Sequence, residues 1–153
     1  MSLKRNEWPS RIIRDMSDEI LNLAIHMRTI TGCSMVPSPD PEAHVRYTNG
    51  SSLHCIGTSG SKRSLATDVF LRNEQVSKFI LTAPTTPGLG GLGIYFDTRL
   101  SGAKRVLVHM DIRENHMLWV CPSRSKGQKR EYIYQHKDSE RYYKILSQEL
   151  GKL

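Results

Sequence analysis

Two histidines and one aspartate, placed in separate segments, are of the residue types that bind metal ions. His54 lies in the segment SLHCIG (52–57), Asp68 in ATD (66–68) and His109 in VHMD (108–111). Two imidazole nitrogens and a carboxylate can occupy three corners of a tetrahedron around zinc. The fourth corner is then left for water, as in catalytic rather than structural zinc sites. We therefore predict a zinc site formed by His54, Asp68 and His109.

Asp111 is placed to take part in the chemistry of such a site. On a strand, His109 and Asp111 point to the same face, because side chains alternate with a period of two. Asp111 would then act as the general base that takes a proton from the zinc-bound water, or it would orient His109 through a hydrogen bond. The sequence leaves both roles open, and Asp111 is our candidate catalytic residue.

Three helices and several strands are expected to position these residues. Ser17 is a favoured N-cap before a helix that ends near Gly32, with the apolar stripe Ile20, Leu23, Ala24, Met27 and Ile30. Residues 104–112 form the clearest strand, residues 117–121 the next, and residues 131–135 another. A terminal helix begins at Asp138 or Ser139, and Asn73 is expected to cap a shorter helix that runs to about Thr82.

The segments between these elements are expected to be loops. Three prolines within residues 37–41 forbid regular structure, so a loop extends to Ser52, with His44 as a solvated residue. Ser52 is expected to brace the His54 loop and Tyr95 to line the cleft. Residues 123–130 predict a basic turn exposed to solvent.

A glycine-rich segment, residues 88–93, matches the dinucleotide-binding pattern G-x-G-x-x-G letter by letter. That motif requires a strand before it and a helix after it, whereas here prolines precede it and the strand-like Ile94-Tyr95-Phe96 follows. We reject the dinucleotide interpretation. The glycines instead predict a tight loop and a close approach of the backbone to another group, such as a peptide substrate.

The pattern Ser-x-His-x-x-Gly … Ala-x-Asp, followed by His-x-Asp, resembles the zinc D-Ala-D-Ala carboxypeptidase and L-Ala-D-Glu endopeptidase family, which shares its fold with lysostaphin-type peptidases and the Hedgehog domain. The resemblance runs from about residue 17 to residue 119. The family has a compact His-x-x-Gly-x-Ala-x-Asp, whereas thirteen residues separate His54 from Asp68 here. The insert, residues 58–64, is small and polar, so we expect a mobile excursion at the cleft rim.

The resemblance implies an α+β fold with a small antiparallel sheet packed on helices. It also implies a Zn²⁺-dependent peptidase that cuts peptidoglycan peptides next to a D-residue, as a phage endolysin, a virion-associated wall hydrolase or a small bacterial peptidase does. Family members bind the substrate carboxylate or the oxyanion through an arginine in the loop before the first histidine, which implies Arg46. They often carry Glu-x-x-His at the second histidine, but Val106 occupies that position.

Length and composition indicate one domain over residues 1–153. The chain has 38% hydrophobic and 24% charged residues, in the range of globular proteins, and no apolar run approaches the roughly 20 residues of a membrane helix. The N-terminus shows no secretory signal, so we expect synthesis in the cytoplasm and access to the wall by phage-mediated or lysis-mediated release. The three cysteines lack the C-x-x-C spacing of zinc knuckles or redox motifs, and their odd number argues against a full disulfide framework. The oligomeric state is left open.

Two other functions compete with the peptidase. A catalytically inactive module of the same fold would keep the metal and bind cell wall, and the missing glutamate favours it. A small nucleic-acid-binding protein would explain the net charge of +7. Its basic residues are scattered, however, and no nucleic-acid-binding motif is present, so we expect nucleic acid not to be the partner.

Overall fold

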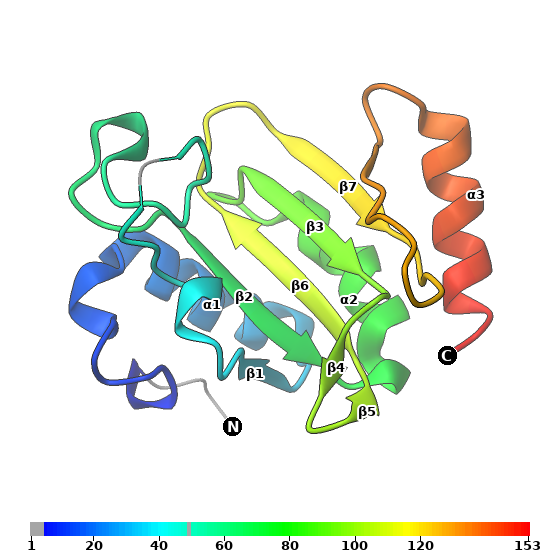
Figure 1. The fold of residues 1–153 in the computed structure, drawn as a ribbon, viewed down its shortest axis with the longest axis horizontal. Helices are drawn as coiled ribbons and strands as arrows, with labels where there is room; N and C mark the ends of the chain where they lie inside the picture. The colour runs from blue at the N-terminus through cyan, green and yellow to red at the C-terminus, as the bar shows by residue number, and fades with distance from the viewer. Residues whose placement is uncertain (1–4, 49) are drawn as a thin grey trace.

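A six-stranded sheet forms the centre of the computed structural model, which describes residues 5–48 and 50–153 (Figure 1). The strands lie in the order β1-β2-β6-β3-β7-β8. Their bounds, in that order, are Met35–Pro37, Ala66–Leu71, Val106–Asp111, Gly91–Tyr95, Met117–Cys121 and Ile133–Tyr134. A separate hairpin joins β4 (Arg99–Leu100) and β5 (Ala103–Lys104). The first four residues, on which part of the secretion-signal prediction rests, lie outside the described residues.

The sheet is mixed, so the prediction of an antiparallel sheet is wrong in one place. All neighbours run antiparallel except β3 and β7, which are parallel. β6 pairs with β3 in antiparallel fashion, and a short connection reverses the chain after β6. β7 crosses to the free side of β3 and must therefore run in the same direction as β3.

Helices cover one face of the sheet and lie along its β7–β8 edge (Figure 1). α1 (Asp18–Thr31) contacts β2 and β6, and α2 (Val76–Thr82) packs beside α1 on the same face. α3 (Ser139–Leu150) lies against β7 and β8. Short 3₁₀ turns span Arg5–Glu7, Ile13–Asp15, Pro41–Ala43, Thr58–Gly60, Asn73–Gln75 and Ala83–Thr85. No helix in the described part of the chain has the length and apolarity needed to cross a bilayer.

The predicted helix signals are largely confirmed. The Ser17 hydroxyl accepts from the backbone N–H of Ile20, and Gly32 has the left-handed conformation, φ 61°, that ends α1. Asp138 caps α3 by accepting from the N–H of Arg141. Two details are wrong: Ile30 is 40% exposed, and Asn73 lies inside a 3₁₀ turn instead of capping a helix.

The strand period divides the sheet into an apolar face and a polar face. Val69, Val108 and Ile94 are buried in the core beneath the helices, together with Trp8 from the N-terminal segment. On the opposite face, one row of residues in register crosses five strands: Asp68, His109, Gly93, Trp119 and Tyr134. The row places two of the predicted metal ligands next to each other at the centre of the sheet.

Glycines on β3 make room for the side chains of neighbouring strands. A Cβ at Gly93 would lie 2.2 Å from the Trp119 ring, and one at Gly91 would lie 2.4 Å from the Asp111 carboxylate. The predicted close approach is therefore real. The groups that approach β3 at these positions belong to the protein itself, however, and not to a substrate.

Replacement of Gly93 by alanine is expected to reduce stability by about 1–3 kcal/mol, because the new methyl group overlaps Trp119 in a packed sheet. Urea unfolding of the variant measures this loss. Gly151→Ala is the matched control, because its Cβ would meet its nearest neighbours at 3.6 Å, an ordinary contact. If both variants unfold at the wild-type urea concentration, Trp119 does not pack on Gly93 as described.

The insert between the two halves of the motif is tied to the protein at its C-terminal end. The backbone N–H of Ser64 donates to the backbone carbonyl of Asp15, and the carbonyl of Ser64 accepts from the backbone N–H of Ser17 at 2.9 Å. The Ser64 side chain is fully buried and donates to the carbonyl of His44. Among the described residues, none from 58 to 64 lines the central cleft. The prediction that the insert lies at the cleft rim is therefore wrong.

Candidate metal centre

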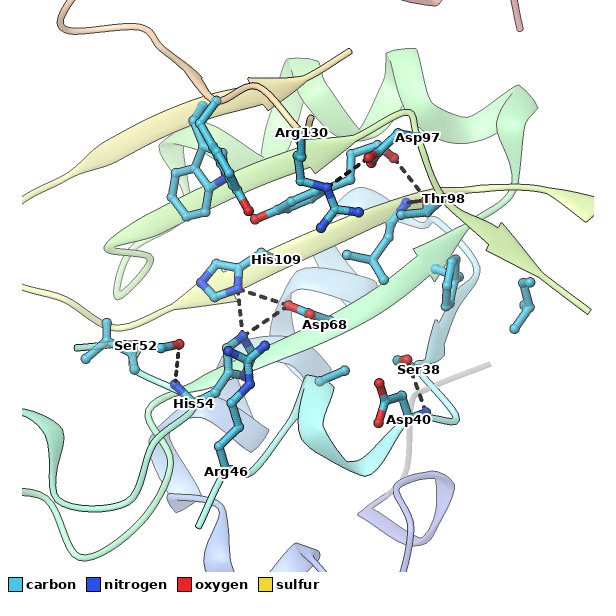
Figure 2. Close-up of a pocket in the computed structure, with 18 of the residues that line it drawn as sticks. Ser38, Asp40, Arg46, Ser52, His54, Asp68, Asp97, Thr98, His109 and Arg130 are labelled. Carbon is cyan, nitrogen blue, oxygen red and sulfur yellow. Dashed lines mark hydrogen bonds and ion pairs between the residues drawn. The ribbon is translucent and has the colours of Figure 1, made fainter. Parts of the chain in front are cut away.

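The ligand atoms of His54, Asp68 and His109 converge at one point above the sheet (Figure 2). His54 Nε2 lies 3.0 Å from His109 Nδ1, which lies 2.9 Å from Asp68 Oδ1. His54 Nε2 and Asp68 Oδ1 are 3.4 Å apart. Both histidines are buried, and the group is one that could hold a metal ion. The long separation in sequence between His54 and Asp68 does not prevent them from meeting.

Backbone hydrogen bonds fix the position of each of the three candidate metal-binding residues. Asp68 on β2 and His109 on β6 are paired residues of adjacent strands. His54 lies on a loop that is held by a backbone hydrogen bond. The backbone N–H of Arg46 donates to the carbonyl of His54 at 2.8 Å. Ser52 Oγ accepts from the N–H of His54 at 3.3 Å, as predicted for a residue that braces this loop. The site thus combines two rigid strands with one pinned loop.

Asp111 contacts His109 on the side away from the other ligands. Its Oδ2 lies 2.9 Å from His109 Nε2, and its carboxylate is fully buried. Arg113 clamps Asp111 through Nε, at 2.8 and 2.9 Å from the two oxygens, and through Nη2. Asp111 does not line the cleft. Of the two roles left open by the sequence, this geometry favours the one in which Asp111 orients His109.

Charge in the buried cluster is balanced by hydrogen bonds. Burial would raise the pKa of Asp68, but hydrogen bonds from His109 and His54 hold it well below its usual range. Burial would lower the pKa of His109, but hydrogen bonds to Asp111 and Asp68 outweigh burial and raise the pKa to about 9. Asp68 is therefore an anion at neutral pH, as a metal ligand must be, whereas His109 carries a proton that a bound metal ion would displace from it.

A cleft of about 860 Å³ opens over the three ligands. Arg46 lines it beside His54 (Figure 2), as expected for the arginine of the preceding loop. The Arg46 Nε donates to the carbonyl of Glu42 at 3.0 Å. Tyr95 lines it on the other side, as predicted, with Trp119 and Tyr134. The Trp119 ring packs 5.1 Å from the ring of His109 and donates from Nε1 to the Tyr95 hydroxyl at 3.0 Å.

His44 is not solvated, contrary to the prediction. It is fully buried, with Nδ1 2.7 Å from Thr67 Oγ1 and Nε2 2.8 Å from the carbonyl of Ser38. Burial lowers the pKa of His44, which favours the neutral ring. Polar partners on both nitrogens satisfy the ring inside the protein, so His44 is a structural residue next to the site and not a metal ligand.

One cleft residue was not predicted from the sequence. Arg130, at the end of the predicted solvated turn, lines the cleft and bonds from Nε to Asp97 Oδ2 at 2.8 Å. Arg124 bonds to the same oxygen from outside the cleft. Nothing in the local pattern of residues 123–130 separates Arg130 from its solvated neighbours. Its partner Asp97 lies thirty-three residues earlier in the chain.

Comparisons with family models, with curated proteins and with solved structures found no match to this chain.

Proposed function

We propose that this chain is a zinc-dependent peptidase that hydrolyses peptidoglycan peptides next to a D-amino acid, with the Hedgehog-type and D-Ala-D-Ala-peptidase-type fold that its motifs resemble. The observation that carries the proposal is the convergence of His54 Nε2, His109 Nδ1 and Asp68 Oδ1 at the base of an open cleft. The motif around these residues, and Arg46 beside them, support the family resemblance. An endolysin or a wall hydrolase of a virion is the form of enzyme we propose.

The spacing of the three donor atoms fits a tetrahedral ion. At metal–ligand distances of about 2.0–2.2 Å, the corners of a tetrahedron are roughly 3.3–3.6 Å apart. The observed separations of 2.9, 3.0 and 3.4 Å are close to these values. Two nitrogens and one oxygen also suit zinc better than calcium or magnesium, which prefer oxygen ligands.

The side chains of the chain would divide the work of hydrolysis between them. His54, Asp68 and His109 would hold the ion, and Asp111 fixes the ring of His109 by accepting from Nε2. When bound there, zinc would supply a water of lowered pKa, about 7, and a positive charge that polarises the scissile carbonyl. Arg46 binds a substrate carboxylate or stabilises the oxyanion from the loop above His54. Trp119 and Tyr95 form the wall along which the peptide lies.

The small number of carboxylates in the cleft that could act as general base favours a second candidate, a module that binds metal and wall without turnover. Among the described residues, the carboxylates that line the cleft are Asp40, Asp68 and Asp97. Asp68 is a metal ligand, and Asp97 accepts from two arginines. Asp40 remains as a carboxylate able to accept a proton, and its Oδ1 already accepts from the N–H of Glu42.

Release of peptide fragments from purified peptidoglycan tests the proposal. We expect the protein to generate new amino or carboxyl termini, to lose this activity after treatment with a chelator, and to regain it with about one equivalent of zinc per chain. Zinc binding without new termini would favour the binding module. Cleavage that persists after complete removal of metal would contradict the proposal.

A further inference from the structure

Arg130 is held in one orientation by the groups around it. Its Nε donates to the buried carboxylate of Asp97 at 2.8 Å, and its guanidinium lies 5.2 Å above the ring of Tyr95. Tyr95 is fixed in turn by the hydrogen bond from Trp119. Burial would lower the pKa of the Arg130 guanidinium, but Asp97 and Tyr132 beside it hold that pKa above its usual range. Because Asp97 engages Nε and the Tyr95 ring covers one face of the guanidinium, a ligand would approach Arg130 at its Nη end.

The free end of Arg130 belongs to the same cleft as the metal centre. The Arg130 side chain is 35% exposed and lines that cleft. Figure 2 shows Arg130 and Arg46 on opposite sides of His109 and Asp68. Contacts between side chains connect Arg130 to the centre through Tyr95, Trp119 and His109. A ligand that crosses the three metal-binding residues would therefore meet one arginine at each end.

We propose that Arg130 binds a carboxylate of the substrate, in a subsite on the β7–β8 side of the metal centre. The inference deepens the proposed function and rests on it. It names the substrate class as peptides that carry a carboxylate on each side of the cleaved bond, one for Arg46 and one for Arg130.

The chemistry of the site favours a carboxylate over a nucleic-acid phosphate. Two N–H groups at the end of a guanidinium match the two oxygens of a carboxylate in one plane. The stacking of Arg130 on Tyr95 and its bond to Asp97 reduce the motion that binding would otherwise have to freeze. A nucleic acid strand would require a continuous row of cations. The cleft is lined by Arg46, Arg99, Arg113 and Arg130 but also by Asp40, Asp68 and Asp97, so charges of both signs lie along it.

Arg124 provides a matched control for the test. It donates from Nε to the same Asp97 oxygen at the same distance, 2.8 Å, but does not line the cleft. Arg124→Gln and Arg130→Gln each remove one cation and one of these two bonds to Asp97. Only Arg130→Gln removes a group from the cleft, so a difference between the two variants reports the subsite and not the stability of the turn.

The experiment measures binding of a stem peptide that carries free carboxylates and of matched peptides in which one carboxylate at a time is an amide. Wild type and Arg124→Gln should bind the free acid about 10–100-fold more tightly than one of the amides, as expected for a charge-assisted hydrogen bond. Arg130→Gln should bind the two forms equally. Equal discrimination in all three proteins would overturn the inference, as would acid and amide binding wild type alike.

Two further outcomes separate this inference from the proposed function. If the acid is preferred through Arg130 but no peptide is ever cleaved, the subsite stands and the peptidase proposal fails. If peptides are cleaved but Arg130→Gln leaves the preference for the acid unchanged, the peptidase stands and the subsite fails. Salt-sensitive binding of DNA that is lost in Arg130→Gln, with no preference between peptide acid and amide, would assign Arg130 to nucleic acid and overturn the inference.

Discussion

His54→Ala is expected to reduce the affinity for zinc by more than 100-fold and to abolish cleavage of peptidoglycan. The substitution removes one of three protein ligands, a larger loss than the roughly 10–100-fold cost of removing a group that only supports a ligand. His54 is the best of the three ligands to change, because its buried Nδ1 has no partner and its Nε2 contacts only the other ligands among the described residues. The fold therefore loses little besides the site.

Titration with a chromophoric zinc chelator measures the affinity, and circular dichroism checks that the variant is folded. His26→Ala is the control, because His26 is exposed on α1 away from the cleft. Wild-type zinc affinity in a folded His54→Ala protein would exclude His54 from the metal centre.

Asp111→Asn is expected to weaken zinc binding by about 10–100-fold and to leave a protein whose activity returns when zinc is added in excess. Asp111 accepts from Nε2 of His109, and that bond keeps Nδ1 directed at His54 and Asp68. The amide can rotate to present either an oxygen or an N–H to His109, so the ring is held less firmly. Arg113 also loses the anion that it clamps.

The alternative role of Asp111 makes a different prediction for the same variant. As general base, Asp111 would be needed for proton transfer, so its loss would lower kcat by about 10²–10⁴ with normal zinc content. Cobalt substitution adds a readout that is independent of turnover, because the intensity of its visible bands reports the geometry of the ligands. A normal cobalt spectrum with a low kcat would contradict the orienting role. Normal values of both would remove Asp111 from the mechanism and make Asp40 the next carboxylate to test.

Local patterns predicted the parts of the structure that depend on nearby residues. The Ser17 cap, the Gly32 end of α1, the strand of residues 117–121 and the two faces of β6 follow from short-range rules. These rules place His109 and Asp111 on one face. When β6 pairs with β2, His109 lies opposite Asp68 and Asp111 lies opposite Ala66.

Features that depend on contacts between residues far apart in the chain could not be predicted from the sequence. β7 lies parallel to β3 because it crosses to the free side of that strand, a choice that no local pattern records. His44 is buried because Thr67 and the carbonyl of Ser38 satisfy its ring, and Arg130 enters the cleft because Asp97 anchors it. The polar insert is held because Ser64 bonds to the N-terminal segment. From their neighbours in the sequence alone, His44, Arg130 and Ser64 would each be predicted to be exposed polar side chains.

X-ray absorption at the zinc edge of the purified protein tests directly whether His54, Asp68 and His109 bind zinc. We expect about one zinc per chain, bound by two imidazole nitrogens and one carboxylate oxygen at about 2.0–2.2 Å, with a water in the remaining position. Absence of zinc from protein reconstituted with the metal would contradict this expectation. A shell of sulfur at about 2.3 Å would also contradict it, because the ligands would then be cysteines, of which Cys55 is the neighbour of His54.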